Sequence, residues 1–177
     1  MTTLTQNRAN QDKTFQFDIR LDWLGRKRGI LSAKDVKDTI RVALPPAFGG
    51  TGEEWSPEHL FLGSISSCFM TTYLVFADKL GIELTHFESH ANGKVELVDG
   101  RYEFTSVTIN AKLFIADESL REKAILALAK AKKYCLVSNS FKAGITYDVE
   151  VLLDNHPLHK EVTGFSVTRK DYADSQS

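Results

Sequence analysis

The sequence predicts an α+β fold in the order β-β-β-α-β-β-α-β, and three observations support it. A length of 177 residues, with 42% hydrophobic and 25% charged residues, is typical of an ordinary globular protein. Stretches with alternating apolar side chains, separated by glycine and proline turns, predict strands. A long apolar run over residues 57–80 predicts a central helix. We expect a flexible arm over residues 1–12, one domain over 13–153 and a polar tail over 154–177, with hairpins rather than alternating β-α-β crossovers.

Three strands are expected before the long helix. The apolar side chains that alternate with polar ones in the first are Phe15, Phe17, Ile19 and Leu21. Gly25 and Gly29 bracket the turn that follows, which contains two arginines and a lysine. Short apolar stretches at residues 30–31 and 40–44 predict two more strands of a meander, and the prolines and glycines of residues 45–52 end it.

The start and the end of the long helix are both marked in the sequence. Ser56 is suited to cap it, Pro57 to occupy its first position, and Glu58 to face the positive end of its dipole. Gly81 is suited to end it in a left-handed conformation. The helix has about seven turns and is apolar nearly all round, so we expect it to be central and buried. Its smaller side allows another backbone to approach closely and consists of Gly63, Ser64, Ser66 and Ser67.

Two long strands, a second helix and a last strand follow. The strands are expected over residues 84–97 and 102–115, joined by a hairpin turn at Asp99-Gly100. Asp117 is suited to cap the second helix, which ends near Cys135, and residues 145–151 alternate as a final strand. The expected apolar face of the second helix is Leu120, Ala124, Ile125, Leu128 and Ala131.

Composition and charge exclude several classes of function. A formal net charge of −1 lacks the basic surplus that nucleic-acid binding needs. The N-terminus has no apolar secretory core and no apolar run is expected to reach the ~18 uncharged residues of a membrane span, so we expect a cytoplasmic protein that does not bind membranes. Two cysteines, with histidines at unsuitable spacing, predict no metal site, and no cofactor is implied.

The two cysteines are the candidate chemical groups. Cys68 lies inside the apolar helix, where a free cysteine is most often a small buried hydrophobe. Cys135 lies at a helix end before the polar run Ser138, Asn139 and Ser140, where filling a core is a less natural role. Two cysteines in a reducing compartment therefore leave two interpretations open, core packing and a redox cycle.

Three motifs resemble the OsmC/Ohr family of thiol-dependent peroxidases over roughly residues 14–152. They are Ser-Pro-Glu-His-Leu-Phe at 56–61, Ser-Cys-Phe at 67–69 and Cys-Leu-Val-Ser-Asn at 135–139. The resemblance implies that Cys68 is the peroxidatic cysteine, Cys135 the resolving cysteine and Glu58 an orienting carboxylate. It also implies an activating arginine in the first turn, for which Arg26 is favoured over Arg28.

This resemblance implies a peroxidase that reduces organic hydroperoxides, fatty-acid hydroperoxides among them, and a dithiol reductant such as a lipoylated protein. A neighbouring guanidinium would lower the pKa of the thiol, and a second thiol would convert the sulfenic acid to a disulfide. The alternatives are a non-enzymatic binding or stress protein of the same fold and a thiol redox sensor without turnover.

The spacing of Glu58 and Cys68 predicts a homodimer. Ten residues along one helix correspond to ~15 Å of rise and about 280° of rotation, so these side chains cannot meet within one chain. We expect an intertwined homodimer in which each glutamate, with its arginine, completes the site around the partner's cysteine.

Overall fold

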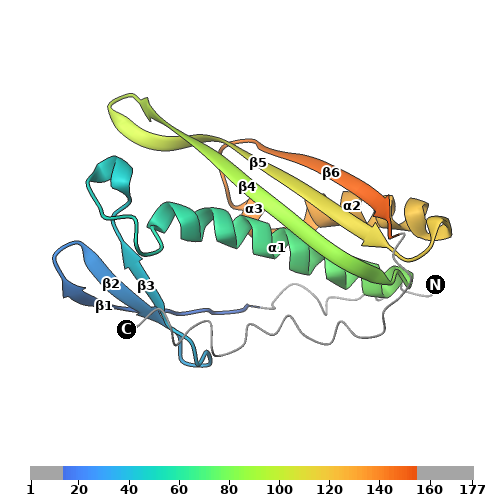
Figure 1. Cartoon of the computed structure of the whole chain (residues 1–177), viewed down its shortest axis with the longest axis horizontal. Helices are drawn as coiled ribbons and strands as arrows, with labels where there is room; N and C mark the ends of the chain where they lie inside the picture. Colours follow the sequence, from blue (N-terminus) through green and yellow to red (C-terminus); the bar gives the residue numbers. More distant parts are fainter. Residues whose placement is uncertain (1–13, 155–177) are drawn as a thin grey trace, which may run out of the picture. The chain divides into compact units, whose positions relative to one another are not determined.

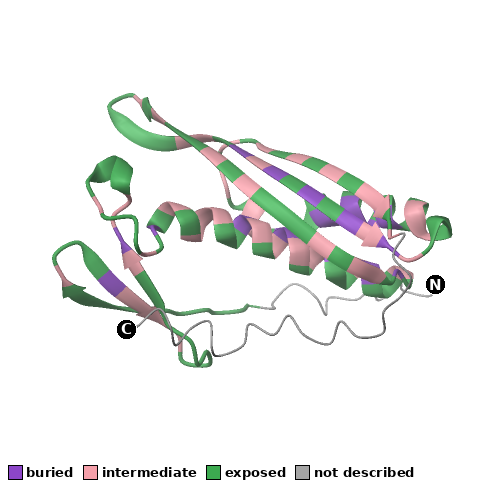
Figure 2. Ribbon diagram, viewed as in Figure 1, coloured by how far each residue is buried: buried purple, intermediate pink, exposed green. Residues whose placement is uncertain are grey.

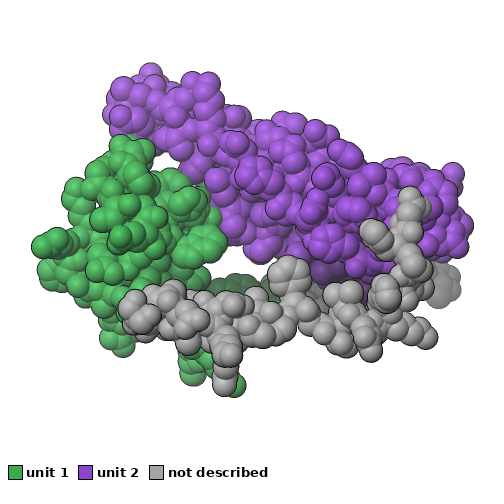
Figure 3. Space-filling view, viewed as in Figure 1, with its two compact units in different colours: residues 1–61 green, residues 62–177 purple. Residues whose placement is uncertain are grey.

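The structure is a computed structural model that describes residues 14–154 (Figure 1). The chain divides into two compact units, one up to Phe61 and one from Leu62 onward (Figure 3). The arm expected over residues 1–12 and nearly all of the tail expected over 154–177 lie outside the described residues. The single domain over 13–153 stays a prediction.

The first unit contains a three-stranded antiparallel meander. Its strands are β1 (Arg20–Gly25), β2 (Arg28–Ser32) and β3 (Ile40–Ala43), in that order across the sheet, followed by the 3-10 helix η1 (Pro46–Phe48). This meander was expected.

The first strand, however, begins later than the alternation predicts. Arg20 pairs with Ser32, the last residue of β2, so the backbone before Arg20 has no partner there. A side-chain pattern alone does not form a strand without a neighbour to receive its hydrogen bonds. The aromatic side chains of Phe15 and Phe17 are accordingly exposed.

Helix α1 (Pro57–Leu80) begins and ends where the sequence predicts. The hydroxyl of Ser56 accepts a hydrogen bond from the backbone N–H of His59 (3.3 Å), and Nδ1 of His59 accepts one from the N–H of Ser56 (3.2 Å). This is a reciprocal capping box in which histidine replaces the usual glutamate or glutamine. Gly81, with φ of 64°, follows the last turn in the left-handed region.

One face of α1 is buried in the described chain. The fully or almost fully buried side chains lie four residues apart, at Ile65, Phe69, Tyr73 and Ala77. The exposed residues opposite them form a stripe that we call the outer stripe of α1, made of Gly63, Ser64, Ser67, Thr71, Leu74 and Val75. The expectation of burial all round is therefore wrong for the described part of a single chain.

The length of this apolar helix also corrects an expectation. Helix α1 is long and apolar enough, by length and composition, to cross a membrane. The prediction that no run reaches that length is thus wrong. A core helix of a globular protein has the same composition, and the spacing of the buried residues of α1 is that of a helix lying on a sheet.

The second unit contains a three-stranded sheet with β5 (Arg101–Ile115) between β4 (Leu84–Val98) and β6 (Ile145–Leu153). The β4–β5 hairpin turns at Asp99 and Gly100, both with positive φ, as the sequence predicts. Figure 2 shows the buried centre running along β5. The inward side chains of β5 with almost no exposure are Val107, Ile109, Ala111, Leu113 and Ile115.

The last connection of this sheet differs from the expectation of hairpins. Strand β6 pairs with β5 in parallel, from Val107 opposite Ile145 onward, so the segment between them is a crossover. That segment consists of η2 (Glu118–Leu120), α2 (Arg121–Tyr134) and α3 (Leu136–Asn139). Figure 1 shows β5, α2 and β6 following one another in this path.

Helix α2 is the main element of this crossover, and most of its buried residues are alanines. Its buried residues are Ala124, Ala127, Leu128 and Ala131, and Ile125, expected on the apolar face, is exposed. Asp117 caps η2, since its carboxylate accepts a hydrogen bond from the N–H of Ser119 (2.8 Å), and α2 follows without a break. Small buried residues let α2 lie close to its neighbours while its C-terminal end presents Cys135.

Candidate functional site

The second unit brings the two cysteines together. Cys68 lies on α1 next to the buried Phe69 and is partly exposed, whereas Cys135 is fully buried at the end of α2. The thiol of Cys135 donates a hydrogen bond to the sulfur of Cys68. Two thiols that interact in this way are neighbours in the fold, which favours them as partners of a disulfide.

The helical conformation is interrupted at Cys135, between α2 and α3. A new helix therefore starts after Cys135, and its first backbone N–H groups are hydrogen-bond donors for Cys68. Cys135 is extended (φ −64°, ψ 108°), with its N–H bonded to the carbonyl of Ala131 and its own carbonyl accepting from the N–H of Asn139. The first N–H groups of a helix have no partner inside it. Those of Leu136 and Val137, at the start of α3, donate to the sulfur of Cys68.

The pKa of the Cys68 thiol lies below its ordinary value. Burial acts against this by raising it, but hydrogen bonds from the N–H of Val137, the thiol of Cys135, the hydroxyl of Thr72 and the N–H of Leu136 outweigh that effect. The Thr72 hydroxyl oxygen lies 4.0 Å from the sulfur. A sulfur atom that accepts several hydrogen bonds is stabilised as thiolate, the nucleophilic form of cysteine.

The pKa of the Cys135 thiol is shifted in the opposite direction, above its ordinary value. Burial raises the pKa of its thiol, and hydrogen bonding and charge from Cys68 raise it further, while donors from Ser138 lower it in part. The hydroxyl of Ser138 donates to the sulfur of Cys135 (3.0 Å). The two shifts are opposite in direction, so Cys68 is the cysteine of the pair that loses its proton more readily.

Ser138 is itself held by a group from another element. The phenol of Tyr147, on β6, donates a hydrogen bond to the Ser138 hydroxyl (2.7 Å). Burial raises the pKa of Tyr147, so the phenol keeps its proton at neutral pH. Sequence reasoning placed Ser138 in a polar run and in the motif at 135–139 without giving it a role, and it missed Tyr147 and Thr72 as residues of the site. The spacing of Thr72, four residues after Cys68 on one helix, was the single available signal.

Glu58 lies in the first turn of α1, and one of its carboxylate oxygens, Oε2, is buried without a hydrogen-bond partner among the described residues. A buried carboxylate oxygen without a partner is costly and rare. Because α1 is continuous from Pro57 to Leu80, ~15 Å of helical rise separates Glu58 from Cys68 along the same helix. The structure therefore does not bring these two residues together within α1.

The two candidate arginines differ in their partners. The guanidinium of Arg28 forms an ion pair with Glu54, with 2.9 Å between Nε and Oε2. The side chain of Arg26 makes no hydrogen bond or ion pair within residues 14–154. Arg26 has a φ of 51°, and its backbone carbonyl accepts a hydrogen bond from the indole of Trp23 (2.9 Å), which holds the turn in this conformation.

Arg26 also lines an apolar cavity of about 330 Å³ in the first unit. Its basic residues are Arg26, Lys27 and Arg28, and Pro57 contributes from the start of α1. The other lining residues are Leu21, Trp23, Gly29, Val42, Ala43 and Leu44. A cavity of this kind can accept an apolar group beside a cation.

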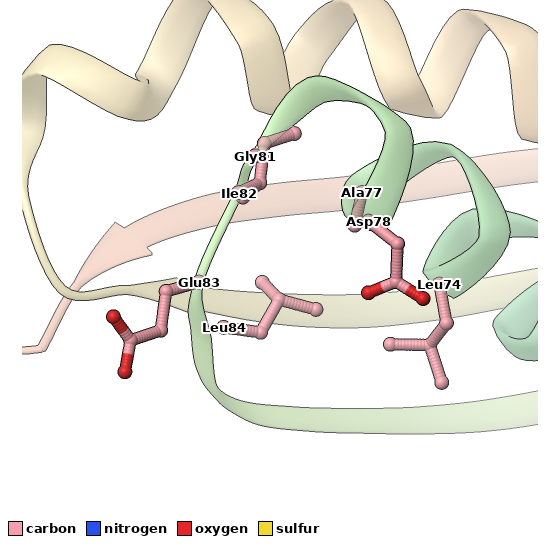
Figure 4. A pocket seen from close by; sticks show the side chains of 7 residues that line it. All are labelled: Leu74, Ala77, Asp78, Gly81, Ile82, Glu83 and Leu84. Atoms are coloured by element: carbon pink, nitrogen blue, oxygen red, sulfur yellow. The ribbon is translucent and has the colours of Figure 1, made fainter.

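A larger cavity, of about 500 Å³, lies at the C-terminal end of α1 (Figure 4). Leu74, Ala77 and Asp78 of α1 line it, with Leu84 at the start of β4, and it contains neither cysteine. Asp78 is ten residues from Cys68, which is ~15 Å along the helix. This cavity is therefore not the candidate site, although it is larger than the one beside Arg26, because it lies away from both cysteines. Residues 14–154 hold no group of three or more acidic, histidine or cysteine side chains that could bind a metal.

Comparison with known proteins agrees with this fold. A Bacillus subtilis protein named uncharacterized protein YmaD is 18% identical over 137 residues, covering 76% of this chain and 91% of that protein. An OsmC-like protein from Vibrio cholerae aligns with a TM-score of 0.67 at 15% identity, over 77% of this chain and all of that one. An organic hydroperoxide resistance protein from Elizabethkingia anophelis aligns with a TM-score of 0.64 at 18% identity, over 81% of this chain and all of that one.

These structural likenesses establish the fold, and they confirm the α+β architecture expected from the sequence. The family itself follows from a family model described as OsmC-like protein, which matches residues 50–150. The matched segment is more than half of the chain and includes both cysteines, so this protein belongs to the OsmC/Ohr family.

Proposed function

We propose that this protein is a thiol-dependent peroxidase that reduces organic hydroperoxides to alcohols. The observation that supports it most strongly is the pair formed by Cys68 and Cys135, in which hydrogen bonds lower the pKa of the Cys68 thiol and burial raises that of its neighbour Cys135. The name of the Elizabethkingia anophelis neighbour, an organic hydroperoxide resistance protein, supports the substrate class.

In the first step, the Cys68 thiolate attacks one oxygen of the peroxide. The S–O bond forms as the O–O bond breaks, which leaves a sulfenic acid on Cys68 and an alkoxide that takes up a proton to become the alcohol. Cys68 is partly exposed and can meet a substrate, whereas Cys135 is fully buried. These exposures support Cys68 as the group that is oxidised first.

In the second step, the sulfur of Cys135 attacks the sulfur of Cys68. The S–S bond forms, the S–O bond breaks, and the hydroxide leaves as water with the proton that Cys135 gives up. The interaction between the two thiols of one chain supports an intramolecular bridge. An external dithiol, for which a lipoylated protein is the proposed source, supplies two electrons and reopens the bridge by thiol–disulfide exchange.

Arg26 is the proposed activating arginine. Its guanidinium makes no ion pair with any described residue, whereas that of Arg28 is held by Glu54. A guanidinium without a fixed partner is available for a thiolate, a peroxide or a carboxylate such as Glu58.

Replacing Arg26 with alanine is expected to slow the oxidation of Cys68 about ten- to a hundredfold, the effect of losing one charge-assisted hydrogen bond. The backbone carbonyl that holds Trp23 is unchanged in this variant. Stopped-flow measurement of the reaction with cumene hydroperoxide gives the rate constant. Arg20→Ala, which removes an exposed arginine paired with Asp22, is the matched control. A larger loss in Arg28→Ala than in Arg26→Ala would assign the role to Arg28 instead.

The homodimer is proposed as the form in which the sites are complete. The outer stripe of α1 is exposed, and its smallest residues, Gly63, Ser64 and Ser67, suit a close crossing with a second helix. The Oε2 atom of Glu58 is buried and has no partner among residues 14–154. An antiparallel crossing would bring each Glu58 toward the partner's cysteine, which its own helix holds ~15 Å away.

Mixing two inactive chains tests this arrangement. Glu58→Ala and Cys68→Ser chains should each be nearly inactive alone, and after unfolding and refolding together they should recover about a quarter of wild-type activity, since half of the dimers regain one of two sites. Thr71→Arg, in the outer stripe, should break the dimer in size-exclusion chromatography with light scattering. Asn110→Arg, on an exposed position of β5, is the control. A fully active monomer at high dilution would exclude shared sites.

We propose that this cycle takes place in the cytoplasm, where thiol reductants keep cysteines reduced. The function is tested by measuring the consumption of cumene hydroperoxide with dihydrolipoamide as the reductant. Repeated turnover is expected, with a higher kcat/KM for cumene hydroperoxide than for hydrogen peroxide. A single oxidation without cycling would identify a thiol redox sensor, and unchanged thiols would identify a binding protein of the same fold.

A further inference from the structure

Resting on the proposed function, we propose that Ser138 and Tyr147 control the second step of the cycle. The Ser138 hydroxyl stabilises the sulfur of Cys135 as the attacking group, and Tyr147 is a positioning residue that orients this hydroxyl. This role is separate from the activation of Cys68.

Three elements contribute to this arrangement. The sulfur of Cys135 lies at the end of α2, the Ser138 hydroxyl on α3 is 3.0 Å from it, and the Tyr147 phenol on β6 is 2.7 Å from that hydroxyl. A hydroxyl has one hydrogen to donate and can accept two others. Because Tyr147 donates to Ser138, the single hydrogen of Ser138 is directed to the sulfur.

The ring of Tyr147 is also held in place by contacts that do not involve Ser138. Its centroid lies 4.8 Å from that of the buried Phe69, and the ammonium of Lys132 lies 5.5 Å from it. Cys135 has no exposed surface, so water cannot solvate a thiolate there. The directed hydroxyl, together with the backbone N–H of the same Ser138, can therefore stabilise the sulfur of Cys135 once it loses its proton, and the hydroxyl has the larger effect of the two.

The proposed timing follows from the groups that face Cys135. These are Cys68 from α1 and Tyr147 from β6, with Lys132 of α2 beyond the tyrosine ring. The negative sulfur of Cys68 raises the pKa of Cys135 in the reduced protein. Oxidation converts it to a neutral sulfenic acid, which removes that effect and leaves the donors from Ser138.

Ser138→Ala is expected to slow disulfide formation about ten- to a hundredfold and to shift its pH dependence to higher pH, while the rate constant for Cys68 oxidation stays unchanged. Tyr147→Phe should act in the same direction with a smaller effect, and Ser138→Thr, which keeps a hydroxyl, should restore the pH profile. The lifetime of the sulfenic acid, trapped with dimedone after rapid mixing with cumene hydroperoxide, gives the rate. Ser140→Ala and Tyr134→Phe are controls, since Ser140 donates to the carbonyl of Leu136 and Tyr134 is exposed.

An unchanged lifetime, or a slowing by the same factor at every pH, would overturn the role of Ser138. A second measurement does not need peroxide. In a Cys68→Ser background, Cys135 is the remaining thiol, and titration of thiolate absorbance at 240 nm should show a higher pKa after Ser138→Ala. A wild-type protein that forms no disulfide would contradict the proposed function, whereas an unshifted titration with normal disulfide formation would contradict this inference alone.

Discussion

Replacing Cys68 with serine is expected to lower peroxide turnover by about a thousandfold or more, because a hydroxyl cannot replace a thiolate as the nucleophile toward the O–O bond. In the wild-type protein, the rate constant for Cys68 oxidation should rise with pH and level off below the ordinary pKa range of a thiol. The direction follows from the hydrogen bonds that lower the pKa of Cys68, since lowering the pH protonates the thiolate. Stopped-flow measurement between pH 4 and 9 checks both expectations.

A structural defect would also lower this activity, so the serine variant needs a check of its fold. Circular dichroism and oligomeric state should match the wild-type protein, because serine is close in size to cysteine and the side chain is only partly buried. Thr72→Val is an informative companion variant that removes one of the donors to Cys68. Its pH profile should shift to higher pH with little loss of the plateau rate. Turnover in Cys68→Ser close to that of the wild-type protein would rule out the proposed nucleophile.

Replacing Cys135 with serine is expected to preserve the first oxidation and prevent the formation of the disulfide. One equivalent of peroxide should be consumed at nearly the wild-type rate, after which the Cys68 sulfenic acid persists and excess peroxide converts it to the sulfinic acid. Turnover with dihydrolipoamide should fall about a hundredfold, because the exchange with the dithiol needs a disulfide. Mass spectrometry of the Cys68 peptide after one and ten equivalents of peroxide distinguishes these states.

The contrast between the two cysteine variants separates their roles. Cys68→Ser should react with no peroxide, and Cys135→Ser should react once. Cys135 accepts a hydrogen bond from Ser138, which a serine side chain can also accept, so the packing around position 135 should be largely preserved. Equal loss of the first oxidation in both variants would show instead that Cys135 is required for attack on the peroxide.

Much of the fold follows from local patterns in the sequence. The capped start of α1 at Ser56 and Pro57, its glycine end and the Asp99-Gly100 hairpin each depend on residues within a few positions of one another. The parallel pairing of β6 does not, because it depends on the path of α2 between two strands. The exposure of the outer stripe of α1 could not be predicted either, because an apolar composition does not tell which face of a helix another element covers.

In the site, too, the sequence identifies single residues but not the contacts between distant ones. The resemblance to a family pointed to Cys68, Cys135, Glu58 and Arg26, but the sequence alone left core packing open as an interpretation of the cysteines, above all for Cys68 inside an apolar helix. The hydrogen bond from Tyr147 to Ser138 joins residues on β6 and α3, and it requires the register of β6 to be known. Likewise, Arg28 pairs with Glu54, which is 26 positions away in the sequence. No local pattern therefore shows that Arg28 has an ion-pair partner and that Arg26 has none among the described residues.

The most direct test of the account is a thiol count combined with disulfide mapping after one equivalent of cumene hydroperoxide. The fully reduced protein contains two cysteines. We expect both thiols to disappear, the intact chain to lose about 2 Da as its two thiol hydrogens leave, and a single peptide pair to link Cys68 to Cys135 within one chain. Two thiols remaining after peroxide treatment, or a bridge that joins different chains, would contradict it.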